Sequence, residues 1–351
     1  MKKIQLNKTS RVNFATYGGV ILAFIILQIL GGAGMLSSTM KGQLVPICAY
    51  VAMALSLNLT VGVLGELSLG HAGFMSVGAF AGAVSAAALP IPSDGARLAA
   101  SMVIGAVMAA IVGTLVGIPA LRLNGDYLAI VTLAFGQIIK SIAENLYIGV
   151  DSRGLHFSFL ENRIIFREGG RMILTGAMGV NGIQKISTFT AGFILVMLVL
   201  IVIFNLVGSR AGRAIMALRD NRIAAESVGI QVTKYKLMAF VISAAMAGAA
   251  GTLFALGQNT ITANKFDFNT SILILVFVVL GGQGNMWGSI LAATFLTVLP
   301  ETRALRGLAD YRMLIYAVIL ILVMLATNNS TVQDFINSKF RKKKKKEGTA
   351  K

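Results

Sequence analysis

Two halves of opposite chemistry meet in residues 210–251, which read RAGRAIMALRDNRIAAESVGIQVTKYKLMAFVISAAMAGAAG. The first half is polar and basic, and the second half is apolar and built from small residues. Because long hydrophobic runs lie on both sides, we expect 209–236 to be a loop at one face of a membrane. Loops rich in Arg and Lys stay on the cytoplasmic side, so this face is predicted to be cytoplasmic.

Within this loop the sequence predicts one short helix with an apolar side. Gly212 and Gly229 bound the helix, and its apolar positions follow helical spacing. These positions are Ile215, Leu218, Ile223 and Val228. A cytoplasmic helix of this kind, between two spans, must dock its apolar side on lipid or on a protein partner.

The composition is that of a polytopic helical membrane protein. Of the 351 residues, 56% are hydrophobic and only 13% are charged, whereas soluble domains carry about 25% charged residues. The net charge of +17 would suggest nucleic-acid binding in a soluble protein. Here the basic residues flank apolar runs, which membrane topology explains, so no nucleic-acid partner is expected. The single cysteine, Cys48, excludes an internal disulfide, and two distant histidines give no metal-site spacing.

Ten apolar segments predict an all-α bundle of about ten transmembrane helices, occupying 17–327. Each segment is close to, or somewhat below, the ~20 residues that a span needs. The segments are 17–36, 43–64, 69–89, 98–119, 127–147, 188–208, 237–257, 268–282, 286–300 and 311–327. The first is too long for the apolar core of a signal peptide, so we interpret it as a span.

Three segments are expected in the cytoplasm, and they constrain the topology. They are the N-terminal tail 1–16, the loop 209–236 and the basic tail 328–351, which contains six consecutive basic residues. An even number of spans follows, so 268–300 must cross twice. Eight spans with a re-entrant segment is the open alternative. The basic tail either fixes this topology or binds anionic membrane lipid.

The loop 148–187 is expected outside, and within it 157–174 is interpreted as an amphipathic segment at the membrane interface. Small residues also recur at helical spacing and predict helices that approach closely in lipid. The pairs are Gly78 and Gly82, Gly113 and Gly117, Ala244 and Gly248, and Ala247 and Gly251.

Polar residues and glycines interrupt the apolar segment at 58–82, NLTVGVLGELSLGHAGFMSVGAFAG. Polar groups at membrane depth must face protein or a water-filled cavity. Asn58, Ser68 and His71 are therefore candidates for a pathway wall or a helix break. The open alternative is a loop between two spans, with Ser68 capping the next helix.

A second interruption lies at 281–288, GGQGNMWG. Gly282 and Gly284 mark either a broken helix on a transport path or a simple chain reversal. No Gly-Lys-Ser/Thr follows, so this is not a phosphate-binding loop, and nucleotide chemistry is not expected in this chain.

One predicted helix, 127–147, carries a polar stripe. Gln137, Lys140 and Glu144 fall on one side of it, and the last two are spaced to form an ion pair. The stripe faces either a cavity or the outer membrane interface, and we favour the interface.

Four blocks resemble the permease subunits of bacterial branched-chain amino acid ABC importers of the LivM type. One is the 210–251 stretch, with its GRAI and ALRDN sequences, and another is SLGHAGF in 58–82, where Glu66 stands in place of the family's usual glutamine. The others are LRLNGDYLAIVT at 121–132 and the glycine-rich 281–288. They occur in family order over about 49–288.

The resemblance implies the ABC importer permease fold in a bacterial cytoplasmic membrane. The chain would form half of the pathway for leucine, isoleucine and valine, with a paralogous permease, two cytoplasmic ABC ATPases and an extracytoplasmic solute-binding protein. Its helix at 214–229 would couple to an ATPase. The residues expected in this coupling loop are Gly212, Arg213, Ala217, Leu218, Arg219, Arg222, Glu226 and Gly229.

Neither a catalytic residue nor a cofactor is expected, because ATP hydrolysis would belong to the partner subunits. Three alternatives are open. They are a nucleoside or sugar permease of the same superfamily, a self-contained secondary transporter, and a membrane enzyme. The secondary transporter would need coupling-ion ligands and repeated halves, and the enzyme would need a catalytic cluster, none of which the sequence presents.

Overall fold

A computed structural model describes residues 8–33, 37–123, 125–151, 154–159 and 170–299, together with 314, 318 and 321. The chain divides into two compact units, Met1–Val298 and Leu299–Lys351, and every element named below belongs to the first. Apart from the three single positions, the predicted span 311–327 and the basic tail 328–351 lie outside the described residues.

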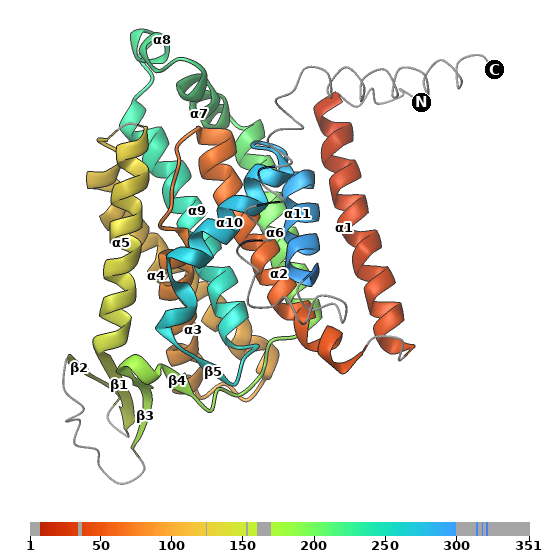
Figure 1. Ribbon diagram of the computed structural model, residues 1–351, viewed down its shortest axis with the longest axis vertical. Helices are drawn as coiled ribbons and strands as arrows, with labels where there is room; N and C mark the ends of the chain where they lie inside the picture. The colour runs from red at the N-terminus through yellow and green to blue at the C-terminus, as the bar shows by residue number, and fades with distance from the viewer. Residues whose placement is uncertain are drawn as a thin grey trace. The chain divides into compact units, whose positions relative to one another are not determined.

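Seven of the described helices are long and apolar enough to cross a membrane, and all of them fall on predicted segments. They are α1 (Lys8–Gly32), α2 (Ser38–Asn58) with its π-helical continuation η1 (Leu59–Leu64), α3 (His71–Ala88), α4 (Asp94–Ala120), α5 (Asp126–Asn145), α6 (Phe189–Gly208) and α9 (Val232–Ala255). The prediction of a polytopic helical bundle is confirmed (Figure 1).

Two shorter apolar helices, α10 (Phe268–Gly281) and α11 (Met286–Val298), occupy the next two predicted segments. At 1.5 Å per residue each is about 20 Å long, which is shorter than the ~30 Å hydrocarbon core of a bilayer. They pack against each other and against α2. A short 3₁₀ turn, η3 (Ala263–Phe266), precedes α10.

The core of the bundle is built around α2 and α9. Every residue from Val51 to Leu64 is buried, which agrees with a helix that is apolar on all sides. α9 packs against α2, α3 and α4, whereas α1 contacts mainly α6 and exposes most of its apolar side chains.

Small residues let α3, α4 and α9 approach closely, as predicted. A Cβ atom on Gly78 would overlap the backbone of Gly248, and one on Gly251 would overlap the backbone of Met75. On α4, Gly113 lies directly against Ala244. Because apolar surface gains little by helix association in lipid, backbone contact of this kind supplies much of the packing.

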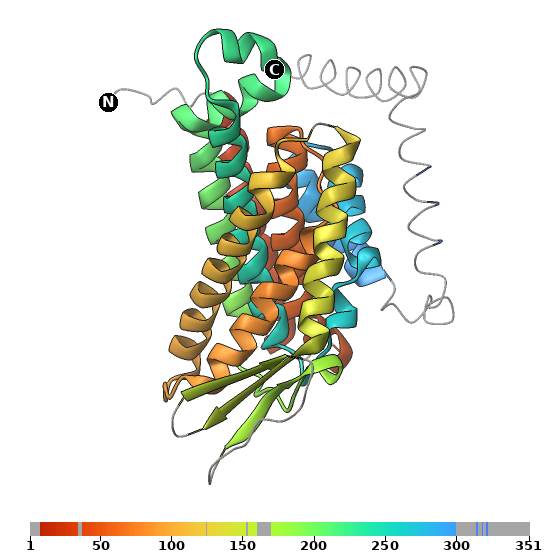
Figure 2. The same cartoon turned by 90° about the vertical axis from the view of Figure 1, so that its left-hand side faces the viewer.

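A small antiparallel sheet covers one end of the bundle (Figure 2). Its strand order is β2-β1-β3-β4-β5. The strands are β1 (Leu146–Asp151), β2 (Gly154–Phe159), β3 (Arg171–Thr175), β4 (Val180–Asn181) and β5 (Thr260–Ile261). Two short helices, α7 (Arg210–Asp220) and α8 (Arg222–Ser227), lie at the opposite end (Figure 1).

The sheet was not predicted from the sequence. The described parts of the predicted amphipathic segment 157–174 are strands, and 160–169 lie outside the described residues. The strands are short, and β4 pairs with β5, which lies some 80 residues further along the chain. No local alternation of apolar and polar residues therefore predicts the sheet. Phe157 and Phe159 remain exposed on β2, which suits a position at the membrane interface.

We predict that Gly78→Ala destabilises the protein, because the added methyl group meets the α9 backbone and not a flexible side chain. Overpacking of this kind costs roughly 1–3 kcal/mol. Gly42→Ala is the matched control, since Gly42 lies in α2 with open space around it, and it should leave stability unchanged or raise it by up to about 1 kcal/mol. Thermal unfolding of the purified proteins measures both changes. Equal unfolding temperatures for the two variants would refute the close α3–α9 contact.

Candidate functional site

The basic loop 209–236 contains two short helices, so the prediction of one helix was wrong. α7 ends at Asp220 and α8 begins at Arg222, with Asn221 between them in an extended conformation. The Asn221 side chain caps α8 by accepting a hydrogen bond from the Ala224 amide at 3.0 Å. Asparagine is one of the preferred helix N-cap residues, so the break is encoded at this position.

The break also divides the predicted apolar side. Ile215 and Leu218 on α7 are buried against the bundle. Ile223 on α8 is 80% exposed and Val228, just after it, is 76% exposed. The four apolar residues therefore do not form one face: α7 docks on the chain's own helices, whereas α8 presents two bare aliphatic side chains.

The glycines and charged residues of this loop have distinct places. Gly212 is buried where α6 turns into α7, and a Cβ atom there would overlap the α6 backbone. Gly229 follows α8 with a φ of +86°, the left-handed conformation that ends many helices. Arg222 and Glu226 lie one turn apart on the exposed α8, and the Nε of Arg222 is 3.8 Å from the Oε1 of Glu226. Arg213 is exposed and donates to the Gly208 carbonyl, while Ala217 packs near Leu218.

Arg219 connects the loop to the membrane segment. Its Nη1 donates to the Gly62 carbonyl oxygen at 2.8 Å, and its other nitrogens bond Asp220 on the same helix. Gly62 belongs to the last turn of η1, where carbonyl groups lack helical partners. Arg219 thus satisfies a helix end and does not simply face solvent.

A buried ion pair joins the segment after η1 to α9. The carboxylate of Glu66 contacts the Nζ of Lys236, and both side chains are largely shielded from solvent. From the sequence, Lys236 was counted among the basic residues of an exposed loop, and this was wrong, because α9 begins at Val232 and buries it. The acidic Glu66 inside an apolar region was the signal that a cation lies nearby.

Asn58 holds the turn between α10 and α11. Its Oδ1 accepts from the Gly284 amide at 2.8 Å, and its Nδ2 donates to the Ser289 hydroxyl at 2.9 Å. Gly282 and Gly284 have φ of +88° and +79°, which glycine adopts without strain. Of the two interpretations of 281–288, the structure shows the chain reversal.

His71 and Ser68 lie at the start of α3 and are buried. His71 Nε2 is 3.0 Å from the Ser243 hydroxyl, which also receives a hydrogen bond from Thr60. The Ser68 hydroxyl has no partner among the described residues, so the alternative in which it caps α3 was wrong. The contribution of Thr60 and Ser243 was not predictable from the sequence, because they are single polar residues in apolar helices.

Polar side chains from other helices take over the capping of α3. The Leu69 amide donates to Thr132 of α5 at 3.1 Å, and the Ala72 amide donates to Ser271 of α10 at 3.3 Å. The segment 65–70 is thus exposed at Gly65 and becomes buried toward the start of α3.

These contacts form a polar network of separate links that all end on the segment 58–66. Arg219 joins this segment to the basic loop, Lys236 joins it to α9, and Asn58 joins it to the α10–α11 turn. Within the described residues there is no cluster of three or more metal-binding side chains. The network is suited to joining moving segments and holds no arrangement for bond chemistry.

We predict that Glu66→Gln and Lys236→Met each destabilise the protein by roughly 3–5 kcal/mol, because each leaves one buried charge without its partner. The double variant Glu66→Gln/Lys236→Met should recover most of this loss. Lys234→Gln is the control, since Lys234 is exposed on the same turn of α9, and its effect should stay within about 0.5 kcal/mol. Thermal unfolding of the unaltered chain, the two single variants and the double variant completes a double-mutant cycle. A double variant as unstable as the sum of the single variants would show that the two charges are not coupled.

Comparison with known proteins places the chain in a family. The family model described as "Branched-chain amino acid transport system / permease component" matches residues 39–324. The LivM permease protein of the high-affinity branched-chain amino acid transport system of Escherichia coli K12 is 38% identical over 286 residues, which cover 79% of this chain and 66% of that protein. The match therefore spans slightly less than two thirds of LivM.

Two other permeases of Escherichia coli K12 are more distant. The ribose import permease RbsC is 25% identical over 285 residues, covering 79% of this chain and 81% of RbsC. LivH is also 25% identical, over 299 residues, covering 79% of this chain and 88% of LivH. No solved structure matches the chain. The long family match and the helical bundle together show that this multi-pass membrane protein belongs to the permease components of the branched-chain amino acid ABC transport family.

Proposed function

We propose that this chain forms half of the membrane pathway of a bacterial importer for leucine, isoleucine and valine. The higher identity to LivM, at 38%, than to the ribose permease, at 25%, supports amino acids over sugars. Sugar import is the second candidate, because the ribose permease matches over an equally large share of this chain.

The observation that carries the coupling part of this proposal is the exposed apolar surface of α8. Ile223 and Val228 stand free beside the charged pair Arg222 and Glu226, at the end of the bundle opposite the sheet (Figure 1). An apolar centre with a charged rim is typical of a protein docking site. We assign its occupant as a cytoplasmic ABC ATPase subunit, and one ATPase would bind each permease of the pair.

Movement of α8 has a physical route into the membrane. α8 is joined to α7 at Asn221, and Arg219 on α7 is bonded to Gly62 of η1. The Gly284 amide in the α10–α11 turn donates to Asn58, the residue directly before η1. Lys236 forms an ion pair with Glu66 in the segment after η1. ATPase closure would thus shift packed elements that already contact each other, and not a free loop.

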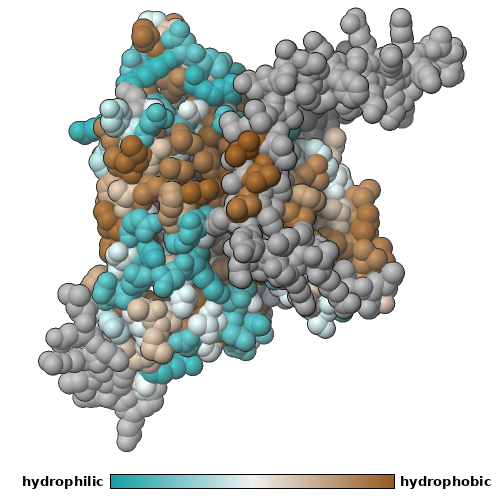
Figure 3. All heavy atoms as spheres, in the orientation of Figure 1, coloured by the Kyte–Doolittle hydropathy of each residue, from teal (hydrophilic) through white to brown (hydrophobic). Residues whose placement is uncertain are grey.

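The pathway itself needs a polar surface within the membrane. A hydrophilic patch covers the half of the bundle nearer the sheet, over α5 and the start of α10 (Figure 3). It includes Lys140 and Glu144, which are 3.6 Å apart near the end of α5, together with Lys265 and Asp267. Such groups must face protein or water, so we propose that a paralogous permease completes the pathway on this face.

The orientation follows from the basic loop. With α7 and α8 in the cytoplasm, the sheet lies outside, where a solute-binding protein would deliver the substrate, and α1 begins in the cytoplasm (Figure 1). We predict that green fluorescent protein fused after Lys351 is fluorescent and that alkaline phosphatase inserted within 160–169 is active. Fluorescence requires a cytoplasmic location and phosphatase activity an external one. An active phosphatase after Lys351 would refute the predicted even number of spans.

We predict that Ile223→Ser/Val228→Ser separates the permease from its ATPase. Both side chains are exposed, so the variant should fold normally, and loss of two central contacts of about 2 kcal/mol each would lower ATPase binding more than a hundredfold. Recovery of the ATPase with the tagged chain, and ATP-driven uptake in membrane vesicles, are the measurements. Lys234→Gln, an exposed change on neighbouring α9, is the control and should retain both.

The same vesicles test the substrate. The unaltered importer should accumulate leucine, isoleucine and valine when its binding protein is present. Ribose accumulation without leucine accumulation would select the sugar alternative. ATPase recovery that is unchanged in Ile223→Ser/Val228→Ser would refute the role of α8.

A further inference from the structure

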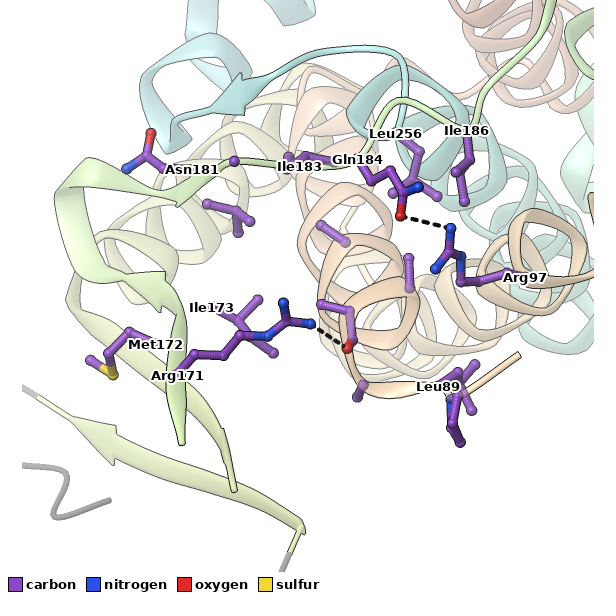
Figure 4. Close-up of a pocket in the computed structure, with 17 residues that line it drawn as sticks. Leu89, Arg97, Arg171, Met172, Ile173, Asn181, Ile183, Gln184, Ile186 and Leu256 are labelled. Carbon is purple, nitrogen blue, oxygen red and sulfur yellow. Dashed lines mark hydrogen bonds between the residues drawn. The ribbon is translucent and has the colours of Figure 1, made fainter. Parts of the chain in front are cut away.

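A pocket of about 400 Å³ lies at the external end of the bundle, far from α8 (Figure 4). The end of α3, the start of α4, the end of α9 and strands β3 and β4 enclose it. Its volume is within the range of roughly 300–1,000 Å³ that is typical of small-molecule sites. Neither the coupling surface nor the buried polar network includes it.

Two arginines reach this pocket from different elements. Arg97 on α4 donates from Nη2 to Gln184 at 2.9 Å and to Asp94 at 2.6 Å, and its buried Nε has no partner among the described residues. Arg171 on β3 donates from Nη2 to the carbonyl oxygen of Ala87 at 3.1 Å. Figure 4 shows the two guanidinium groups on facing sides of the pocket.

The charges in the pocket do not cancel. Asp94 neutralises Arg97, whereas Arg171 forms no ion pair with any acidic side chain that the structure describes. Guanidinium groups bind carboxylates through two parallel hydrogen bonds. Among the described residues the pocket thus has one guanidinium without an acidic partner and one buried N–H donor without an acceptor, and both suit an anionic ligand group.

Beside the polar side chains of Asn181 and Gln184, part of the wall is aliphatic. It is formed by Ala83, Ile173, Ile183, Ile186 and Leu256. Ile186 and Leu256 belong to a buried cluster with Leu98, so this wall is fixed by packing. A hydroxyl group placed against this aliphatic part of the wall would be left unpaired, which is unfavourable. An alkyl side chain fits the wall without this cost.

We propose that this pocket binds an aliphatic amino acid, with its carboxylate at Arg171 and its alkyl side chain against the aliphatic wall. The naming of the amino acid rests on the proposed function, in which this end of the bundle receives substrate from outside. A lipid phosphate group offers Arg171 a similar anion, and the pocket adjoins an apolar groove through Ala88 and Leu89, which line both. The test separates these two sources.

The test uses the assembled importer in lipid nanodiscs, without its solute-binding protein. Saturation-transfer NMR detects binding through the methyl signals of leucine. Leucine should bind, and leucinol, in which a hydroxymethyl group replaces the carboxylate, should not. Arg171→Gln should weaken leucine binding at least tenfold. Equal binding of leucine and leucinol would overturn the proposal.

Matched variants keep the result interpretable. Lys185→Gln removes a positive charge two residues from Ile183 but outside the pocket lining, and should bind leucine normally. Arg171→Lys keeps the positive charge but cannot form two parallel hydrogen bonds, so its affinity for leucine should be intermediate. If Arg171→Gln does not fold, the leucine affinity of Arg171→Lys tests the proposal instead. Leucine affinity that is the same in Arg171→Lys, Lys185→Gln and the unaltered chain would refute the site.

Two further outcomes are distinct. Mass spectrometry that finds a phospholipid retained by the unaltered complex and by Lys185→Gln, but lost in Arg171→Gln, with no leucine signal, would assign the pocket to lipid and overturn the proposal. Uptake is measured separately. If the unaltered importer takes up leucine and Arg171→Gln binds leucine as well as the unaltered chain does, the pocket is refuted and the proposed function stands. If leucine binding depends on Arg171 but the importer takes up no leucine, only the proposed transport substrate is refuted.

Discussion

The backbone between η1 and α3 is largely buried and must find hydrogen-bond partners, and the architecture around it is a response to that constraint. Each unsatisfied backbone group would cost several kcal/mol in hydrocarbon. Side chains from three other elements supply partners, Arg219 from α7, Thr132 from α5 and Ser271 from α10, and Ser243 of α9 donates to the Ser56 carbonyl in the last turn of α2. The interruption of the helix therefore forces distant parts of the chain together.

This arrangement gives the cytoplasmic loop direct contact with the membrane interior. Arg219 and Lys236 both come from the basic stretch, and both end on the interrupted segment, at Gly62 and Glu66. α8 itself packs through Ala225 in a buried apolar cluster with Leu218 of α7 and Val232 of α9, and Arg219 and Lys236 add polar links from α7 and α9 to the interrupted segment. The backbones of α3 and α9 are in close contact, so a displacement of one of these helices would also displace the other. Packed helices move in this way because they do not deform gradually.

Periodic features were predictable and single contacts were not. Nine apolar segments became helices, and the small-residue pairs became the close contacts between α3, α4 and α9, because spacing along a helix decides both. The helix in the basic loop was only half predicted, since Asn221 breaks it and Ile223 and Val228 are exposed. The sheet was missed because β4 pairs with β5, and the helices α6, α7, α8 and α9 all lie between them in the sequence.

Hydrophobic period, charge distribution and the block sequences by themselves determined that the chain is a polytopic membrane permease with a basic loop between two spans, because these properties are local. The partners of Glu66, Asn58 and Arg219 were decided only by tertiary structure. Each partner is more than 150 residues away in the sequence. A polar residue in an apolar helix indicates that it needs a hydrogen-bond or ion-pair partner, but not which residue that partner is. Folding brings the two together because burial makes leaving either one alone too costly.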